Sequence, residues 1–186
     1  MRIIKLGGSL LTTQALPACL DYVAGLPGQT LLVPGGGVFA EQVRNLQSVY
    51  DFNDVSAHRM AILAMQQMAL LFNGLNPDFS LYNSIYAPCN WQGVAVWSAN
   101  IKELDAAGVA NSWDITSDSL AAWLAAHLQA SALIVVKAAD IDPAATTLHL
   151  QQQGIVDAGF NDFAKHLRCP VLIINKDRFL TSPCLT

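Results

Sequence analysis

The chain has 186 residues, of which 53% are hydrophobic and 13% are charged. A chain of this length usually forms one domain, and one this apolar buries enough surface to exclude intrinsic disorder. The net charge is −4 without a basic cluster, so no nucleic-acid partner is expected. No apolar run reaches the roughly 18 residues of a membrane-spanning helix, so no membrane partner is expected either. The small charged fraction leaves little surface that favours water, which predicts a homodimer or a larger homo-oligomer.

The cysteines and the start of the chain bear on the compartment. The cysteines show no C-x-x-C spacing, and we interpret them as buried free thiols: Cys19, Cys89, Cys169 and Cys184. The first eleven residues are apolar like a signal peptide, but Lys5 and the glycine pair at 7–8 interrupt the run. We therefore expect a cytoplasmic protein.

Short apolar runs alternate with longer amphipathic stretches along the whole chain. The first half predicts a strand at 2–6, a weak helix at 10–24 that Pro17 breaks, a strand at 30–33, a helix through 39–50 and a helix from Asn53 or Asp54 to Phe72. The second half predicts strands at 79–85 and 93–97, helices at 101–107 and 116–128, a strand at 133–136, a helix at 157–167 and a strand at 171–174. This alternation predicts an α/β fold, a three-layer αβα sandwich around a largely parallel sheet, as a single domain over residues 1–186.

The predicted helix at 54–72 is apolar on nearly every side. A helix without a polar face is buried on both sides, either inside the domain or against another subunit. Both interpretations stay open, and we favour the subunit interface.

Lysines follow three of the apolar strands, at Lys5, Lys137 and Lys176. Ligands of open α/β sheets bind at the carboxyl ends of the strands, so this placement favours an anionic ligand. The alternative is that strand ends are exposed and simply tolerate lysine.

Two glycine clusters also follow strands, at 7–8 before Ser9 and at 35–37. Glycine backbone at the start of a helix lets a phosphate approach and offers it N–H groups, so the clusters predict two phosphate-bearing sites. Neither a Walker loop nor a G-x-G-x-x-G motif occurs. The combination favours phosphoryl transfer, which requires mainly alignment, positive charge and N–H donors. Asp118 is the candidate to hold the lysines or to help place Mg²⁺, with plain N-capping as its alternative role.

Three segments resemble the amino acid kinase superfamily, in the order and spacing of that family: KLGGSL at 5–10, VPGGGVFAEQVR at 33–44 and WDITSDSLAAWLA at 113–125. Within it, V-P-G-G-G, AHRMAILAM at 57–65, W-D-I-T-S-D-S and IVDAGFNDF at 155–163 are most similar to the [5-(aminomethyl)furan-3-yl]methyl phosphate kinases of methanofuran biosynthesis. The resemblance implies a carbamate kinase-like fold, with the acceptor bound over the N-terminal half and ATP over the C-terminal half. It also implies a reaction in which a phosphate monoester becomes a diphosphate.

The resemblance assigns roles to individual residues. Lys5 would contact the transferring phosphoryl group, and Asp118 would organise the lysines. Gly7, Gly8 and Ser9 would cradle the ATP phosphates, and Lys137 and Asp140 are added as candidates to bind ATP. The acceptor would meet Gly35, Gly36, Gly37 and Thr116. Mg²⁺ would arrive with ATP, because no metal-ligand spacing is present and no metal site of the protein itself is expected.

Four side chains are added on chemical grounds. Arg44 and Arg59 could pair with an acceptor phosphate, and Trp113 could stack on a furan ring. Their alternatives are solvated helix charges and a core indole. His58 is a further candidate to touch the acceptor.

The sequence departs from the family in its C-terminal half. It lacks the T-D-V-D-G-V-Y-like stretch after residues 135–136 and the G-M-x-x-K segment that carries a second catalytic lysine. Lys137 could replace that charge. Two alternatives therefore stay open: a kinase of the same fold that acts on uridylate, isopentenyl phosphate or an amino-acid carboxylate, and a non-catalytic protein that binds a nucleotide or an anion.

Overall fold

The computed structural model describes residues 1–182. Its strands form one sheet in the order β3-β4-β2-β1-β5-β6, and every neighbouring pair is parallel. The strands are β1 (Arg2–Leu6), β2 (Thr30–Pro34), β3 (Ser80–Tyr82), β4 (Val94–Trp97), β5 (Ala132–Lys137) and β6 (Val171–Asn175). The expectation of a largely parallel sheet is confirmed.

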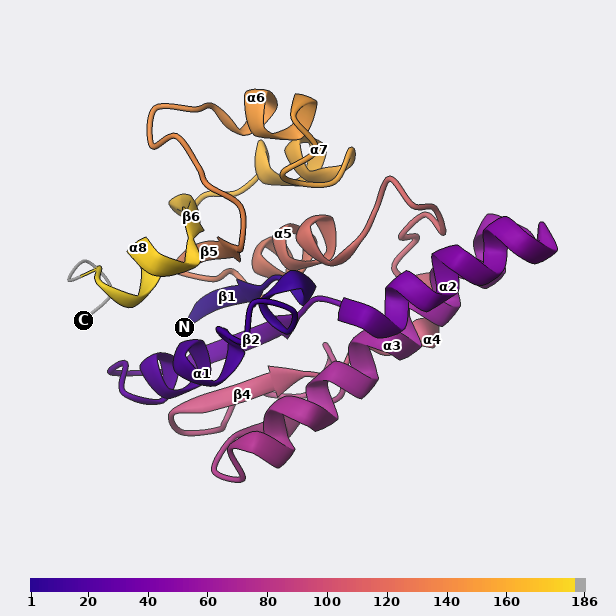
Figure 1. The fold of residues 1–186 in the computed structure, drawn as a ribbon. Helices are drawn as coiled ribbons and strands as arrows, with labels where there is room; N and C mark the ends of the chain where they lie inside the picture. Colours follow the sequence, from indigo (N-terminus) through magenta and orange to yellow (C-terminus); the bar gives the residue numbers. More distant parts are fainter. Residues whose placement is uncertain (183–186) are drawn as a thin grey trace.

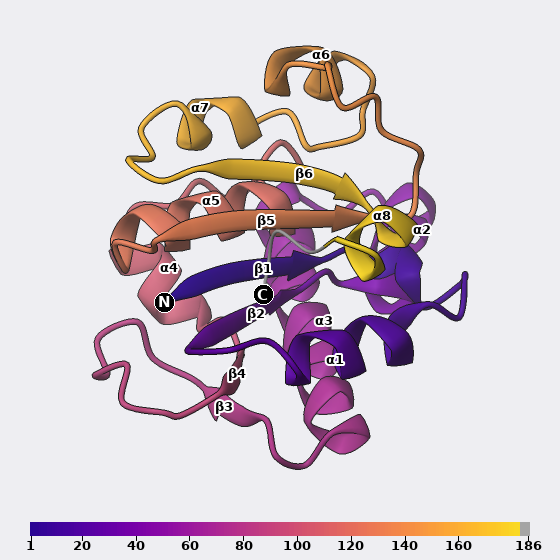
Figure 2. The same cartoon turned by 90° about the vertical axis from the view of Figure 1, so that its left-hand side faces the viewer.

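Helices cover both faces of this sheet (Figure 1). They are the 3₁₀ helix η1 (Gly8–Leu10) and α1 (Leu16–Ala24), α2 (Gly37–Tyr50), α3 (Asp54–Leu75), α4 (Ile101–Ala106), α5 (Ser117–His127), α6 (Thr147–Gln152), α7 (Phe160–Ala164) and α8 (Lys176–Leu180). In Figure 2, α1 and α8 lie on the near side of the sheet, while α4 and α5 lie on the far side. The molecule is therefore the three-layer αβα sandwich that the sequence predicts.

The central strand β1 separates two hydrophobic cores. Ile3 faces a core formed with α5 and the middle of α3, and Ile4 faces a core formed with α1, α8 and the last turns of α3. Both side chains are completely buried, as expected for a parallel strand that helices cover on both faces. Because β1 pairs with β2 and β5, the carboxyl ends of these three strands meet at one edge of the molecule.

Two predicted elements near the N-terminus and in the middle are shorter in the structure. The helix predicted at 10–24 begins only at Leu16, because Pro17 lies in its first turn, where a missing N–H costs little. The strand predicted at 79–85 is limited to β3. Beyond it, Ser84 Oγ and the Ile85 amide donate to the Glu103 carboxylate at 2.5 and 2.8 Å, instead of continuing the ladder.

The C-terminal third differs more from the prediction. The helix predicted at 157–167 is reduced to α7, and α6 and α8 were not predicted. Asp157 cannot begin a helix of its own segment, because its carboxylate accepts hydrogen bonds from the start of α5. Elements of five or six residues also carry too few positions for a reliable hydrophobic period.

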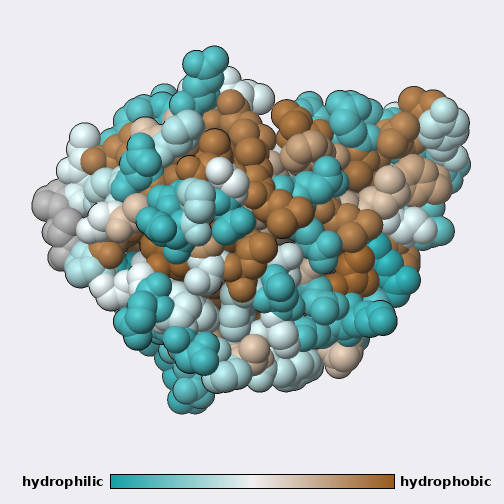
Figure 3. All heavy atoms as spheres, turned by 90° about the horizontal axis from the view of Figure 1, so that it is seen from below, coloured by the Kyte–Doolittle hydropathy of each residue, from teal (hydrophilic) through white to brown (hydrophobic). Residues whose placement is uncertain are grey.

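Helix α3 is only partly covered within one chain. Its buried side includes Met65, Met68 and Phe72, while Leu63 and Leu70 on the other side remain 46% and 59% exposed. Hydrophobic and hydrophilic surfaces are interspersed over the side seen from below in Figure 3. Neither interpretation of the helix is complete, since one side is core and the other is open in the single chain.

The structure also bears on the expectations about membrane-spanning helices and cysteines. No helix within residues 1–182 is long and apolar enough to cross a membrane. Cys19, Cys89 and Cys169 are free thiols, but only Cys19 is buried, and this burial raises the pKa of its thiol to about 11. Cys184 lies outside the described residues.

Candidate active site

The two glycine turns lie directly against each other at the carboxyl ends of β1 and β2. A Cβ atom on Gly8 would be 2.4 Å from the backbone nitrogen of Gly37, and one on Gly35 would be 2.5 Å from that of Gly8. Gly37 also has a φ of 55°, in the left-handed region that favours glycine. The two clusters therefore form one continuous backbone surface, where the sequence suggested two separate ones.

Three charged side chains meet beside this surface. Lys5 Nζ lies 2.7 Å from Asp118 Oδ1, and Lys137 Nζ lies 2.5 Å from Asp118 Oδ2. Lys5 and Asp118 are buried, at 3% and 4% exposure. Lys176, the third lysine at a strand end, instead pairs with its neighbour Asp177 at 2.8 Å. Two of the three predicted lysines therefore converge on the predicted carboxylate.

The electrostatics of this centre follow from burial and mutual charge. Burial alone would raise the pKa of Asp118, but the adjacent charges of Lys5 and Lys137 outweigh it and hold the pKa below its usual range. Burial, and then the charge of Lys5, lower the pKa of Lys137 from 10.5 to about 8. Two lysine ammonium groups share the Asp118 carboxylate, an arrangement that offers cations to a phosphate ligand.

The turn that carries Asp118 is bound by Asp157, a residue that the sequence analysis did not select. Asp157 Oδ2 accepts hydrogen bonds from the Thr116 amide at 2.9 Å, the Thr116 hydroxyl at 2.7 Å and the Ser119 amide at 3.0 Å. The Ser119 hydroxyl donates to Asp157 Oδ1. Thr116 is the N-cap of α5, yet its own side chain makes no capping bond. Asp157 thus caps α5 from a distant part of the chain.

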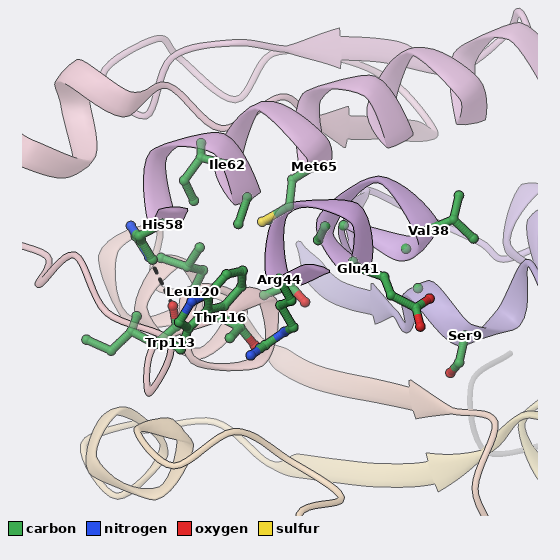
Figure 4. A pocket seen from close by; sticks show the side chains of 18 of the residues that line it. Ser9, Val38, Glu41, Arg44, His58, Ile62, Met65, Trp113, Thr116 and Leu120 are labelled. Carbon is green, nitrogen blue, oxygen red and sulfur yellow. Dashed lines mark hydrogen bonds between the residues drawn. The ribbon is translucent and has the colours of Figure 1, made fainter. Parts of the chain in front are cut away.

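A cavity of about 440 Å³ lies on the side of the glycine turns that faces α2 and α3 (Figure 4). Ser9 and residues 35–37 line it from the turns. Helices α2, α3 and α5 and the segment before α5 contribute further side chains: Val38, Glu41, Arg44, His58, Ile62, Met65, Trp113, Thr116 and Leu120. The cavity thus combines glycine backbone, an arginine and an apolar wall.

A second cavity of about 430 Å³ adjoins the first. Asp118 and Lys137 line it on one side, and the segment 151–158 lines it on the other. Three side chains line both cavities: Arg44, Trp113 and Thr116. Two molecules bound in these cavities would therefore meet at a shared boundary.

The boundary is formed by an arginine stacked on an indole. The guanidinium of Arg44 lies 3.7 Å from the ring centroid of Trp113, an arrangement stabilised by attraction to the π face. Trp113 Nε1 donates to Gln47 Oε1 at 2.6 Å, which fixes the ring against α2. Arg44 thus already covers one face of the Trp113 indole.

Four predicted site residues line neither cavity: Lys5, Gly7, Arg59 and Asp140. The Arg59 side chain is half exposed and pairs with Asp105 at 2.8 Å. Asp140 lies 3.4 Å from the Asn175 amide and lines neither cavity. Gly7 also lines neither, but it contacts β5, where its amide donates to Val136 O at 3.0 Å.

His58 lies in the wall of the first cavity and is buried. Its Nδ1 is 3.2 Å from Asn111 Oδ1, and its Nε2 is 3.0 Å from the Ile115 carbonyl. Both ring nitrogens are therefore engaged by the segment that carries Trp113, and the ring is held in a fixed orientation.

Comparisons with known proteins identify relatives of this chain. Residues 1–142 match the amino acid kinase family. The chain is 27% identical over 148 residues to the [5-(aminomethyl)furan-3-yl]methyl phosphate kinase of Methanocaldococcus jannaschii. The aligned region covers 76% of this chain and 67% of that enzyme.

Solved structures give the same fold. The uridylate kinase of Archaeoglobus fulgidus is 16% identical, with a TM-score of 0.66 over 96% of this chain and 93% of that one. The aspartate kinase of Synechocystis is 13% identical, with a TM-score of 0.65 over 94% of this chain and 37% of that one. The family match covers most of the chain, so this protein belongs to the amino acid kinase family and is an ATP-dependent phosphotransferase.

Proposed function

We propose that this kinase transfers the γ-phosphoryl group of ATP to a small phosphate monoester and forms a diphosphate. The favoured acceptor is [5-(aminomethyl)furan-3-yl]methyl phosphate, the substrate in the name of the Methanocaldococcus relative. The observation that carries the proposal is the pair of adjoining cavities, the second of which Asp118 and Lys137 line, with Lys5 paired to Asp118. Residues 1–186 act as one domain in this proposal.

The first cavity is proposed to take the acceptor. Its glycine backbone at 35–37 and Arg44 suit a phosphate group, and Ile62, Met65 and Leu120 suit a small apolar body. Arg44 would turn its free edge to that phosphate while Trp113 supports its face. Arg59 is not included, because it pairs with Asp105 outside the cavity.

The second cavity is proposed to take the phosphate end of ATP. Lys137 lines it, and Lys5 is coupled to Lys137 through Asp118. The Gly8–Ser9 turn would offer backbone N–H groups from the other side of the boundary. The acceptor would thus lie over the N-terminal half of the chain, and the nucleotide over the C-terminal half.

The transfer itself requires little covalent help from the protein. An oxygen of the acceptor phosphate attacks the γ-phosphorus in line, a new P–O bond forms, and the bond to the bridging β–γ oxygen breaks with ADP as the leaving group. A phosphate dianion needs no general base. The protein contributes alignment and positive charge on the transferring oxygens, and we assign these to Lys5, Lys137 and Arg44.

Mg²⁺ belongs to the proposal as the ion that accompanies ATP. Within the described part of the chain, no three His, Cys, Asp or Glu side chains are grouped to hold a metal. Phosphate oxygens and water would therefore supply its ligands. When bound, the ion would neutralise phosphate charge, while the protein's own cations lie where the transferring group would be.

A homo-oligomer is also part of the proposal. Leu63 and Leu70 on α3 are exposed in the single chain. Covering such side chains is favourable because it removes apolar surface from water.

The test is a phosphorus NMR assay with Mg-ATP and a panel of acceptors: the furan methyl phosphate, uridylate, isopentenyl phosphate and amino-acid carboxylates. We expect a new diphosphate signal from the furan compound alone, lost in Lys5→Ala and kept in Lys102→Ala. Lys102 is an exposed lysine on α4 that lines neither cavity, and it serves as the matched control.

Other outcomes would redirect the proposal. Turnover of uridylate, isopentenyl phosphate or a carboxylate would retain the chemistry and overturn the acceptor. ATP binding without transfer to any acceptor would favour a non-catalytic nucleotide-binding protein.

A further inference from the structure

We propose that Asp157 is a positioning residue of the kinase: it fixes the first turn of α5 and so holds Asp118 between Lys5 and Lys137. This inference rests on the proposed function. Asp157 itself transfers no proton; it acts through the helix that it caps and, by its charge, on Lys137.

The geometry restricts the turn from both ends. Thr116 and Ser119 flank Asp118, and both donate their amide and hydroxyl hydrogens to the Asp157 carboxylate. Four hydrogen bonds to one ionised group leave the intervening residues little freedom to rotate. Asp118 is therefore presented to the lysines by a turn that a remote carboxylate holds.

The same contacts occupy part of the α5 N-terminus. The N–H groups at a helix start are a ready site for a phosphate, but at α5 the amides of Thr116 and Ser119 are already occupied by Asp157. Lys137 lines the second cavity and can meet a phosphate there. Thr116, although it lines both cavities, has its hydroxyl committed to Asp157.

Asp157 also acts on Lys137 through space. The charged groups that face Lys137 are Lys5, Asp118 and Asp157; the first lowers the pKa of its ammonium and the two carboxylates raise it. Removing the Asp157 charge should therefore lower the pKa of Lys137 directly, and lower it further if Asp118 moves away.

The variants follow from this arrangement. Asp157→Asn keeps the size of the side chain and removes its charge. Asp162→Asn is the matched control, because Asp162 is a fully exposed carboxylate of the same segment that pairs with Lys165 at 2.8 Å. Ser119→Ala removes one partner of Asp157 without touching Asp157.

We expect Asp157→Asn to lower kcat about 100-fold, as a misplaced catalytic group does, and to leave KM for the acceptor nearly unchanged. Asp162→Asn should match the wild type. The double variant with Ser119→Ala should be no slower than Asp157→Asn alone, because both changes remove the same link. Independent, multiplying effects would mean that Asp157 contacts the nucleotide directly, and would overturn the inference.

A second measurement does not depend on activity. The chain has five lysines, so ¹³C labelling at the lysine Cε gives few NMR signals, and Lys137→Arg assigns the one of interest. We expect the Lys137 titration to move to lower pH in Asp157→Asn but not in Asp162→Asn.

The two readouts separate failure of the inference from failure of the proposed function. A shifted Lys137 titration in a protein that phosphorylates no acceptor would overturn the proposed function while leaving the link from Asp157 to the centre. An active wild type with an unchanged titration and unchanged kcat in folded Asp157→Asn would overturn the inference alone.

Discussion

Gly8 is the residue at which the two turns of the site touch, and it leaves no room for a side chain. Gly8→Ala would place Cβ 2.4 Å from the Gly37 nitrogen. Because backbone must shift to relieve this contact, we expect a loss of about 1–3 kcal/mol and a Tm lower by roughly 2–10 °C. Thermal unfolding followed by circular dichroism measures it.

The control for this substitution is Gly74→Ala. Gly74 lies inside α3, and nothing lies within 4 Å of the place where its Cβ would be. Alanine there should stabilise the helix by about 0.5–1 kcal/mol. Equal losses from both substitutions would show that crowding at the turns is not the cause.

The lowered pKa of Lys137 predicts a pH dependence. As pH rises through about 8, Lys137 loses its proton in the free protein, and its attraction for phosphate is lost. We expect kcat/KM for Mg-ATP to decline above about pH 8, and to stay level up to pH 9.5 in Lys137→Arg, because arginine keeps its charge. Initial rates in buffers of constant ionic strength test this.

The same shift affects stability with a definite sign. Between pH 8 and 10.5 the unfolded chain keeps the Lys137 proton that the folded chain has released. The contribution of this group to the free energy of unfolding therefore rises with pH across that window. It is unfavourable below pH 8 and vanishes above 10.5.

Candidate site residues that belong to a local sequence signal could be predicted. A residue that acts on a segment far away in the sequence could not. Lys5 and Asp118 follow recognisable local signals, a strand end and a helix start. Asp157 is 38 residues from Ser119, and no local pattern relates a carboxylate to a helix that it caps from such a distance. Only the structure shows that the Thr-Ser-Asp-Ser start of α5 has no capping hydrogen bond from its own N-cap side chain.

At the scale of elements, the hydrophobic pattern predicted the strands that helices cover on both faces. β1, β2, β4, β5 and β6 were all located to within a residue or two. The predicted strand at 79–85 was longer than β3, because the Ile85 amide donates to the Glu103 carboxylate and not to a neighbouring strand. Helices α6 and α8 were not predicted because they are short. Their first turns are fixed by capping hydrogen bonds, from the His149 amide to Thr146 and from the Asp177 amide to Asn175.

Helix α2 and the segment before α5 meet through Arg44 and Trp113, which predicts a selective defect. Trp113→Phe removes the hydrogen bond to Gln47 and weakens the support of the guanidinium. Loss of about 0.5–1 kcal/mol of cation–π energy should raise KM for the acceptor about two- to fivefold. Trp123→Phe, a half-buried indole within α5, is the control. An increase in KM for ATP alone would contradict the assignment of Arg44 to the acceptor.

For the whole molecule, the open side of α3 predicts self-association. We expect a mass that is a multiple of 20.0 kDa by light scattering, and a single-chain mass for the double variant Leu63→Glu, Leu70→Glu. Leu148→Glu serves as the control, since Leu148 is equally exposed on α6. A single-chain mass for the wild type would contradict the proposal.

The family match covers less of the chain than the folded structure does. The match ends at residue 142, after β5, whereas β6, α8 and Asp157 follow it. The last quarter is nevertheless integral, because β6 extends the sheet and Asp157 caps α5. Truncation at the end of the family match would remove both.

The common wall of the two cavities has a consequence for inhibitor chemistry. Since Arg44, Trp113 and Thr116 line both, the proposed acceptor and the proposed donor would lie against the same three side chains. One compound that joins an acceptor-like ring to adenosine through a polyphosphate bridge should occupy both cavities at once. Its affinity would exceed that of either half, because the second half binds at the high local concentration that the first half creates.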